Sequence, residues 1–396
     1  MAKFKFYATR CGTYNGKYYN IGDMLASDTE KVPSFFAQRG VKRQSRSANL
    51  DRIDVSKLPF DKKIDYYCPQ KNYLEHAMPT WLAMPDEMRG TIYIESKMAQ
   101  HAKELYGDIP NVYVYLSVSE LKHHLATKNR YMVCFAYHNC VQLSNFRKMI
   151  LAEHGCGLTY DYPNSQYAGW VRNYDPQHMA HFLTTNKLLD QAHAQKNTGI
   201  PSTIVGMPVM DKYDKQKFKR NSKPVIAISC HWDCDHIPET RSSFSFFKQA
   251  FVELSRHYKV IGHAHPQYQK VMFPFWKKHG IEIVETFDEV LERADVYVCD
   301  NSSTIFQFAY VDKPVVLLNP PWYRTYFTHS FNPRFWSHAD IGVNVFDPYD
   351  LLPAIEKAVQ DDSTQKKARK RAVEDVFANK GHATQAFIKA IMDVLK

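Results

Sequence analysis

Short apolar runs that alternate with helical stretches are the feature that most restricts the fold of this chain. A first series of such runs lies at residues 64–68, 91–94, 111–116 and 131–137, with helical patterns between them. A second series lies at residues 224–229, 258–262, 281–284, 296–299 and 314–318. Strands that alternate with helices form parallel sheets with crossover helices. The two series therefore predict two α/β domains, each built on a parallel sheet, that face each other across a cleft.

The segments outside these series set the expected domain boundaries. Residues 211–223 are polar, hold five lysines and one arginine, and are predicted to link the two domains. We expect α/β domains at 61–211 and 224–375 and a C-terminal helix at 376–396. Residues 1–45 carry the hairpin signal Asn15-Gly16 and are predicted to form a small β-rich module, followed by a linker at 46–60. This module resembles small accessory domains of tailed-phage proteins.

Charge and hydropathy restrict the partners and the location of the chain. The formal net charge is +10, from 51 Lys and Arg against 41 Asp and Glu. Such a bias favours a polyanionic partner, although many basic proteins bind only small phosphorylated ligands. No stretch reaches the roughly 18 consecutive apolar residues that a membrane span needs. The N-terminus also lacks the apolar region of a signal peptide. We therefore expect a cytoplasmic protein with no transmembrane segment.

One cysteine pair has a spacing that a metal site could use. Cys230 and Cys234 are separated by three residues, and His231 and His236 lie beside them. A structural zinc site needs four ligands, and no second Cys/His pair of ligand spacing accompanies these residues. The eight cysteines otherwise follow no pattern, so we expect reduced thiols and no metal site.

The turn after the strand at 296–299 is predicted to bind phosphate. It consists of Asp300, Asn301, Ser302 and Ser303, and a helix is expected from Thr304 onward. Short polar residues favour turns and helix N-termini, where free backbone N–H groups and the positive end of the helix dipole attract anions. The alternative is an ordinary capped turn, which every α/β protein contains.

Other candidate residues lie at further strand ends, where ligands of such sheets bind. His154, followed by Gly155 after a helix predicted at 143–150, has the pKa range of a general base, or else is a structural histidine. His263 and His265 alternate onto one side of an extended segment. Two histidines define no metal site, so donation to a phosphate or leaving group suits them better. The predicted donor or substrate contacts are Gly155, Ser229, His231 and His263.

The order of these segments resembles the CDP-glycerol glycerophosphotransferase family, whose members polymerise teichoic acid and have the GT-B fold. The resemblance implies two Rossmann-like domains that face each other across a cleft holding the active site. The resemblance covers residues 130–395. The matching elements are His154-Gly155, Gly206-x-Pro208-x-x-Asp211, His265-Pro266, Asp300-Asn301-Ser302-Ser303 with Asn301 in place of Tyr, and Gly381-His382-Ala383 with Lys380 in place of Asp.

The resemblance implies a function for each domain. The first domain would bind the acceptor and the second a nucleotide-activated, cytidine-linked donor. His154 would be the base on the acceptor hydroxyl, His265 would assist the leaving phosphate, and the turn at 300–304 would hold the donor diphosphate. GT-B enzymes stabilise the leaving group with protein donors, so no metal or other cofactor is expected.

Two positions depart from the family pattern. The segment Ser229-Cys230-His231-Trp232-Asp233 stands where the family has Pro-Thr-x-Arg, so the arginine is missing. Glu153 stands where the family has a tryptophan before His-Gly. These departures leave the identities of donor and acceptor open.

We therefore expect a metal-independent transferase that moves a glycosyl or polyol-phosphate group to a hydroxyl. The positive charge, the phage-like module and the missing membrane anchor favour hydroxymethylpyrimidine in phage double-stranded DNA as acceptor. Such an enzyme needs a basic surface and must extrude the base. The loop aromatics Tyr160, Tyr162, Tyr167 and Trp170 would stack on that base or pack within the domain. The alternatives are transfer to a cell-surface polymer, and a non-catalytic binding protein on a degenerate GT-B frame.

Overall fold

The computed structural model describes residues 57–156, 174–197, 199–233, 241–323 and 332–396, together with short strands between residues 4 and 37 and at 160–161. Side chains are described for 57–156, 174–195, 197, 199–233, 241–323 and 338–396. The chain divides into two compact units, one of Met1–Phe60 with Leu116–Asn129 and one of Asp61–Tyr115 with Arg130–Lys396. Each unit is described by itself.

The described part of the smaller unit contains paired strands and helix α4. Strand β1 (Phe4–Ala8) pairs antiparallel with β4 (Met24–Ser27) and with β5 (Phe36–Ala37). Strands β2 (Gly12–Tyr14) and β3 (Lys17–Tyr19) pair antiparallel on either side of Asn15-Gly16. Helix α4 (Val118–Leu125) begins after Ser117, whose Oγ accepts a hydrogen bond from the Glu120 backbone N–H at 3.2 Å.

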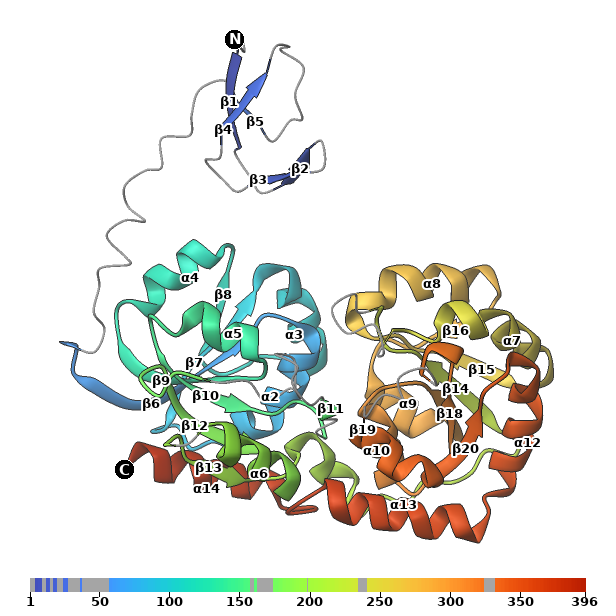
Figure 1. Ribbon diagram of the computed structural model, residues 1–396. Helices are drawn as coiled ribbons and strands as arrows, with labels where there is room; N and C mark the ends of the chain where they lie inside the picture. The colour runs from blue at the N-terminus through green and yellow to red at the C-terminus, as the bar shows by residue number, and fades with distance from the viewer. Residues whose placement is uncertain are drawn as a thin grey trace. The chain divides into compact units, whose positions relative to one another are not determined.

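The larger unit contains two parallel sheets with helices around them, which confirms the predicted two-domain α/β fold (Figure 1). The first sheet has the strand order β13-β12-β10-β9-β6-β7-β8. Its strands are β6 (Phe60–Cys68), β7 (Arg89–Glu95), β8 (Val112–Tyr115), β9 (Asn129–Cys134), β10 (Lys148–Ala152), β12 (Met179–Thr184) and β13 (Ser202–Ile204). Its helices are α2 (Lys71–Ala83), α3 (Ala99–Tyr106), α5 (Tyr137–Leu143) and α6 (Lys187–Lys196).

The helix predicted at 143–150 is wrong. Helix α5 ends at Leu143, and β10 begins at Lys148 and pairs parallel with both β9 and β12. Met149 to Ala152 are all buried, as expected of a strand covered on both faces. Such a continuous apolar run has no alternation that distinguishes it from a buried helix. The correction places His154 directly after a strand.

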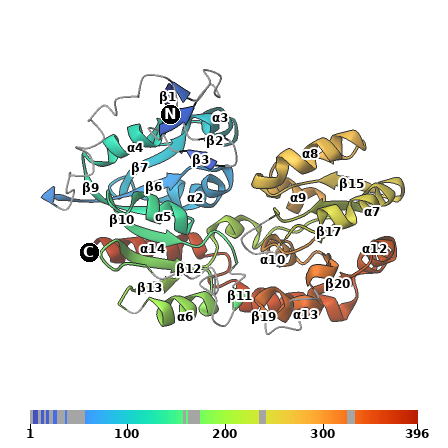
Figure 2. The same ribbon diagram turned by 45° about the horizontal axis from the view of Figure 1, so that its top comes forward.

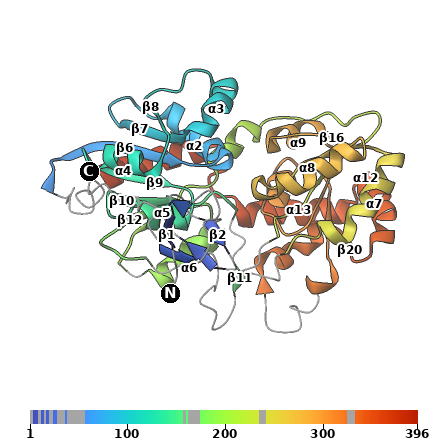
Figure 3. The same ribbon diagram turned by 90° about the horizontal axis from the view of Figure 1, so that it is seen from above.

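The second sheet has the strand order β16-β15-β14-β17-β18-β20, and all five pairings are parallel. Its strands are β14 (Val225–Ser229), β15 (Lys259–Gly262), β16 (Glu282–Ile283), β17 (Val296–Cys299), β18 (Val315–Leu318) and β20 (Gly342–Val345). The described helices of this domain are α7 (Phe244–His257), α8 (Gln269–Lys278), α9 (Phe287–Arg293), α10 (Thr304–Tyr310), α12 (Leu351–Gln360) and α13 (Ser363–Val376). The two sheets remain side by side when the molecule is turned (Figures 2 and 3).

The C-terminal helix α14 (Ala383–Leu395) returns to the first domain, where Phe387 and Ile391 join the core (Figures 1 and 2). Asp211 fixes the start of this helix, because its two carboxylate oxygens accept hydrogen bonds from the Ala383 and Thr384 N–H groups at 3.0 and 2.7 Å. Gly206 precedes this connection with a φ of +86°, and a Cβ there would lie 2.2 Å from the Ala378 carbonyl oxygen. None of the described helices is both long and apolar enough to span a bilayer.

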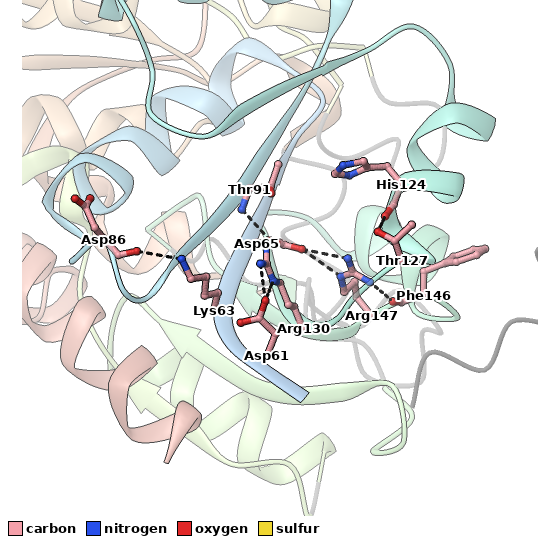
Figure 4. Close-up of polar contacts among 10 residues, drawn as sticks. All are labelled: Asp61, Lys63, Asp65, Asp86, Thr91, His124, Thr127, Arg130, Phe146 and Arg147. Carbon is pink, nitrogen blue, oxygen red and sulfur yellow. Dashed lines mark hydrogen bonds and ion pairs between the residues drawn. The ribbon is translucent and has the colours of Figure 1, made fainter. Parts of the chain in front are cut away.

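A buried cluster of charged side chains lies near the amino ends of the first sheet's strands (Figure 4). The fully buried Asp65 accepts hydrogen bonds from Arg130 Nη1 at 3.0 Å, Arg147 Nη2 at 3.2 Å and the Thr91 N–H at 2.8 Å. Arg130 Nε also donates to Asp61 at 2.7 Å. We call Asp61, Asp65, Arg130 and Arg147 the Asp65 cluster. Its two carboxylates and two guanidinium groups balance one another.

Candidate active site

A cleft of about 880 Å³ opens between the carboxyl ends of the two sheets. The first domain lines it with helix α2 and with the segments that follow β9 and β10. The second domain lines it with the segments that follow β14, β15 and β17. The residues predicted for the site that line this cleft are His154, Gly155, Ser229, His231, His263, His265, Asn301, Ser302, Ser303 and Thr304. The parallel sheets therefore bring segments that are 150 residues apart in the sequence into one cavity.

His154 stands in the wall of the first domain as a neutral base. Its ring forms a hydrogen bond with the Phe135 backbone, and Nδ1 is buried with no hydrogen-bond partner among the described residues. The ring of Tyr73 lies edge-on to it, with a centroid separation of 5.2 Å. Burial lowers the pKa of His154 despite the opposing effect of Glu153. A neutral imidazole with a free lone pair can take a proton from a hydroxyl.

Two further histidines line the same wall and were missed by the sequence analysis. His76 lies on α2, with its ring centroid 6.1 Å from that of His154, and His138 lies on α5. Burial, and then the neighbouring His154, lower the pKa of His76 to about 3. His138 lies in the first turn of the helix that follows β9, at the edge of the sheet where ligands bind, and this position was the available signal for it. His76 lies in the second turn of α2, further from that edge signal.

The histidines of the second domain are hydrogen-bonded in ways that fix their orientation. His263 Nδ1 lies 3.0 Å from Ser229 Oγ, and burial lowers the pKa of His263 to about 4. His265 Nδ1 accepts a hydrogen bond from the Gln267 N–H at 3.2 Å, which leaves Nε2 to carry the proton of the neutral ring. Burial, and then the nearby His231, lower the pKa of His265. The neutral ring can therefore donate a hydrogen bond from Nε2.

Asp300 does not line the cleft, contrary to its predicted contact with the donor. Its carboxylate is fully buried and accepts hydrogen bonds from the His231 N–H at 2.7 Å, the Ser243 N–H at 2.8 Å and Ser243 Oγ at 2.9 Å. Burial raises the pKa of Asp300, while His231 and these hydrogen bonds oppose the shift. Asp300 thus ties the segment after β14 to the start of α7, and a carboxylate would in any case repel phosphate.

The rest of the turn presents hydroxyl groups. Ser302 Oγ lies 2.8 Å from Thr304 Oγ1 and accepts a hydrogen bond from the Thr304 N–H at 3.3 Å. Thr304 Oγ1 also lies 2.9 Å from the Tyr297 hydroxyl. Helix α10 has only seven residues, and Ser303 at its start caps no N–H group with its side chain. The hydroxyl groups of this turn are therefore stronger candidates for an anion than the helix dipole.

Acidic residues outnumber lysine and arginine in the described lining of the cleft. The acidic residues are Glu75, Glu153, Asp211, Glu285 and Asp288. Lys71 and Lys212 are the basic ones, and they pair with Glu285 at 3.3 Å and with Asp288. Burial raises the pKa of Glu75 to about 7. The positive charge of the chain therefore lies mainly away from this part of the cleft.

The structure offers no described group of three or more His, Cys, Asp or Glu side chains that suits a metal ion. Cys230 is buried with its Sγ 3.4 Å from Ser243 Oγ, while Cys234 and His236 lie outside the described residues. The side chains of the aromatic loop, Tyr160 to Trp170, also lie outside the described part. The expectation of no metal requirement thus stays a prediction.

Comparison with known families identifies one match. The model of the family described as CDP-Glycerol:Poly(glycerophosphate) glycerophosphotransferase matches residues 170–393. That range covers more than half of the chain. No curated protein sequence matches the chain significantly.

Solved structures share the fold at low sequence identity. The wall teichoic acid polymerase TagF is 14% identical with a TM-score of 0.62, over 89% of this chain and 94% of that one. MnaA from S. aureus, solved with UDP, is 13% identical with a TM-score of 0.57, over 84% and 97%. A putative UDP-N-acetylglucosamine 2-epimerase from Listeria monocytogenes is 11% identical with a TM-score of 0.53, over 84% and 96%. These likenesses confirm the predicted GT-B fold.

Proposed function

The chain belongs to the CDP-glycerol:poly(glycerophosphate) glycerophosphotransferase family, and on that premise we propose that it transfers glycerophosphate from CDP-glycerol to a hydroxyl of a cell-surface polymer. The family match confirms the expected class of transferase. The observation that carries the proposal is the unpartnered Nδ1 of His154 in a cleft whose other wall holds His265 and the serine turn. A variant of TagF has been solved after a soak with CDPG, which supports a donor of this type.

The arrangement suits an in-line displacement at phosphorus. The acceptor oxygen attacks the phosphorus that carries glycerol, and its proton moves to His154 Nδ1. The bond from that phosphorus to the oxygen that bridges the two phosphates breaks, and cytidine monophosphate leaves with the bonding electrons. His265 Nε2–H donates a hydrogen bond to the departing phosphate, where negative charge develops.

The second domain would hold the donor through neutral groups. Ser302, Ser303 and Asn301 line the cleft beside His265 and offer hydroxyl and amide donors to the diphosphate. Hydrogen-bond donors of this kind can stabilise a leaving phosphate without a metal ion. We therefore expect the transfer to proceed in the presence of a chelator.

The sequence-based alternatives differ in donor and acceptor. A glycosyl donor would be attacked at the sugar carbon and would release cytidine diphosphate. Hydroxymethylpyrimidine DNA as acceptor depends on the net charge of +10, and neither the family nor the matched structures support it. It stays a prediction, and retention on duplex DNA at low salt would be its first requirement.

One reaction panel tests these possibilities together. The protein is incubated with CDP-glycerol or nucleotide sugars, a chelator, and either a teichoic acid primer or hydroxymethylated DNA, and mass spectrometry detects the released nucleotides and products. We expect cytidine monophosphate and an extended primer, both lost in His154→Ala. Release of no nucleotide from any donor would contradict the proposal and favour the non-catalytic binding protein.

A further inference from the structure

Glu153 is the family departure that stands beside the proposed base. It follows β10 directly, and its backbone N–H donates to the Leu183 carbonyl oxygen at 3.1 Å. Its Oε1 lies 2.9 Å from His193 Nε2, its side chain is 15% exposed, and it lines the cleft. Oε2 forms no hydrogen bond with any described residue. One carboxylate oxygen is therefore held in place, and the other remains available to a ligand.

Among the described residues, Glu153 is the side chain to which His193 is hydrogen-bonded. Its side chain is fully buried on α6 and stacked on Phe182, with a centroid separation of 4.1 Å and an interplanar angle of 27°. Its Nδ1 has no hydrogen-bond partner among the described residues, so Glu153 is its polar contact there. A buried imidazole restricted in this way preorganises the carboxylate, which a surface ion pair would not do.

The surroundings of Glu153 are aromatic and apolar. Tyr137 and Tyr174 line the cleft, and their rings meet edge to face at 5.1 Å. Leu151 and Leu189 also line it. Aromatic rings with a polar tip suit ligands that have both apolar faces and hydroxyl groups. This wall thus combines the features that a sugar or polyol needs.

A carboxylate distinguishes hydroxyl groups from phosphate. An ionised carboxylate can only accept hydrogen bonds, so it pairs with hydroxyl donors, whereas an ionised phosphodiester has none to give. Like charges brought together in a cleft also cost binding free energy. The lysines in the described lining, Lys71 and Lys212, are already paired with carboxylates of the second domain.

We propose that Glu153, held by His193, selects an uncharged polyhydroxyl acceptor, such as a glycoside or polyol end, and disfavours an acceptor whose phosphate lies next to the reacting hydroxyl. This inference rests on the proposed function, because it assigns the acceptor class of that transfer. Glu153 is a specificity-determining residue that touches the acceptor, and His193 is a positioning residue that acts through it. The transfer then attaches the first glycerophosphate to a neutral end more readily than it extends a phosphate-bearing chain.

Acceptor binding is measured without turnover by ligand-observed NMR, in the presence of cytidine monophosphate. The probes are methyl β-glucoside and glycerol as neutral acceptors and glycerol 1-phosphate as the anionic one. We expect the neutral probes to bind at least about tenfold more tightly than glycerol 1-phosphate to the unaltered protein. In Glu153→Gln the preference falls below about threefold, because the amide can donate to phosphate.

Two variants separate specificity from stability. Asp190→Asn removes a carboxylate from the same helix that carries His193 but outside the cleft lining, and it leaves the preference unchanged. His193→Asn frees Glu153 without removing it, so it weakens binding of the neutral probes and reduces the preference against phosphate without abolishing it. A merely structural role of the pair would change thermal stability and not the ratio of affinities. If Glu153→Gln does not fold, His193→Asn carries the test.

Failure of this inference and failure of the proposed function give different results. If the protein prefers the neutral probes but releases no nucleotide from CDP-glycerol, the proposed transfer is overturned and the proposed acceptor class is retained. Equal binding of glycerol 1-phosphate and methyl β-glucoside, no binding of any probe, or an unchanged preference in folded Glu153→Gln would overturn the acceptor class, whatever the outcome of the transfer assay.

Discussion

The first domain contains two buried polar centres that differ in how completely their groups are paired. In the Asp65 cluster both Asp65 oxygens bind guanidinium groups, and with the partly exposed Asp61 the two carboxylates balance the two guanidinium groups. At the carboxyl ends of the strands, by contrast, His154 Nδ1 is buried and unpartnered and Glu153 offers a free oxygen to the cleft. Buried polar atoms without partners cost stability. The amino ends of the sheet are thus built for stability, and the carboxyl ends keep unpaired groups for a ligand.

Removal of the proposed base should give the largest effect on activity and a small one on stability. We expect His154→Ala to lower the rate of cytidine monophosphate release by about 10²–10⁴-fold, the usual contribution of a general base. Its unfolding free energy should change little, because removal of the unpartnered nitrogen offsets part of the cost of losing the Phe135 hydrogen bond and the packing of the ring. Rate assays and urea unfolding measure the two effects. His181→Ala, which loses a 2.8 Å contact with Thr203 outside the cleft, is the control and should keep its rate.

Disruption of the Asp65 cluster should have a large effect on stability and a small one on activity. Arg147→Met leaves the buried Asp65 with one cation fewer, and loss of one partner of a buried pair costs about 3–5 kcal/mol of unfolding free energy. The double variant Asp65→Asn, Arg147→Met should be less destabilised than the sum of the single variants, because the buried carboxylate that lost a guanidinium partner is then replaced by a neutral amide. Urea unfolding gives both numbers. A cost below about 1 kcal/mol for Arg147→Met would show that the cluster is no more than a surface-type ion pair.

The strands of the two sheets differ in how well the sequence predicts them. The strands at 225–229, 259–262, 296–299 and 315–318 were readable because each apolar run is bounded by polar turns. Strand β10 was not, since an apolar run buried on both faces has no period. The residues of the second domain that follow its strands were found for the same reason as the strands themselves.

The wall of the first domain was harder to predict. His76 lies in the second turn of α2, where a histidine has no local sign that it faces a cleft, and His138 is marked only by its place at the start of the helix after β9. The contact of Glu153 with His193 joins residues 40 apart and exists only once α6 packs beside β10. Asp300 was assigned to the donor because the turn is typical of phosphate sites. The direction of its carboxylate depends on the segment after β14, which the turn itself does not reveal.

The neutral histidines of the cleft should make stability fall in mild acid. Burial lowers the pKa of His76 to about 3 and that of His263 to about 4, whereas the unfolded chain protonates histidine near pH 6.5. Their contribution is therefore present above pH 6.5 and is lost as the pH falls toward the folded values. We expect a loss of about 1–2 kcal/mol for each of them between pH 7 and pH 5. His76→Gln should remove its share of this slope in urea unfolding, and a flat profile in the unaltered protein would contradict the burial of neutral rings.

Glu75 should give the smallest effect on stability, and its pH dependence should be opposite to that of the histidines. Burial, and then Asp288, raise its pKa to about 7, so the folded protein binds its proton more tightly than the unfolded chain does. Stability from this group is present below its unfolded pKa and is lost as the pH rises through 7. Glu75→Gln should therefore gain about 1 kcal/mol relative to the unaltered protein between pH 6 and pH 8 in urea unfolding. The exposed Glu356→Gln should gain nothing. A gain in both variants would assign the effect to net charge, whereas a gain in Glu75→Gln alone extends the contrast with the Asp65 cluster, because the cleft then keeps a carboxyl group that no cation fully compensates.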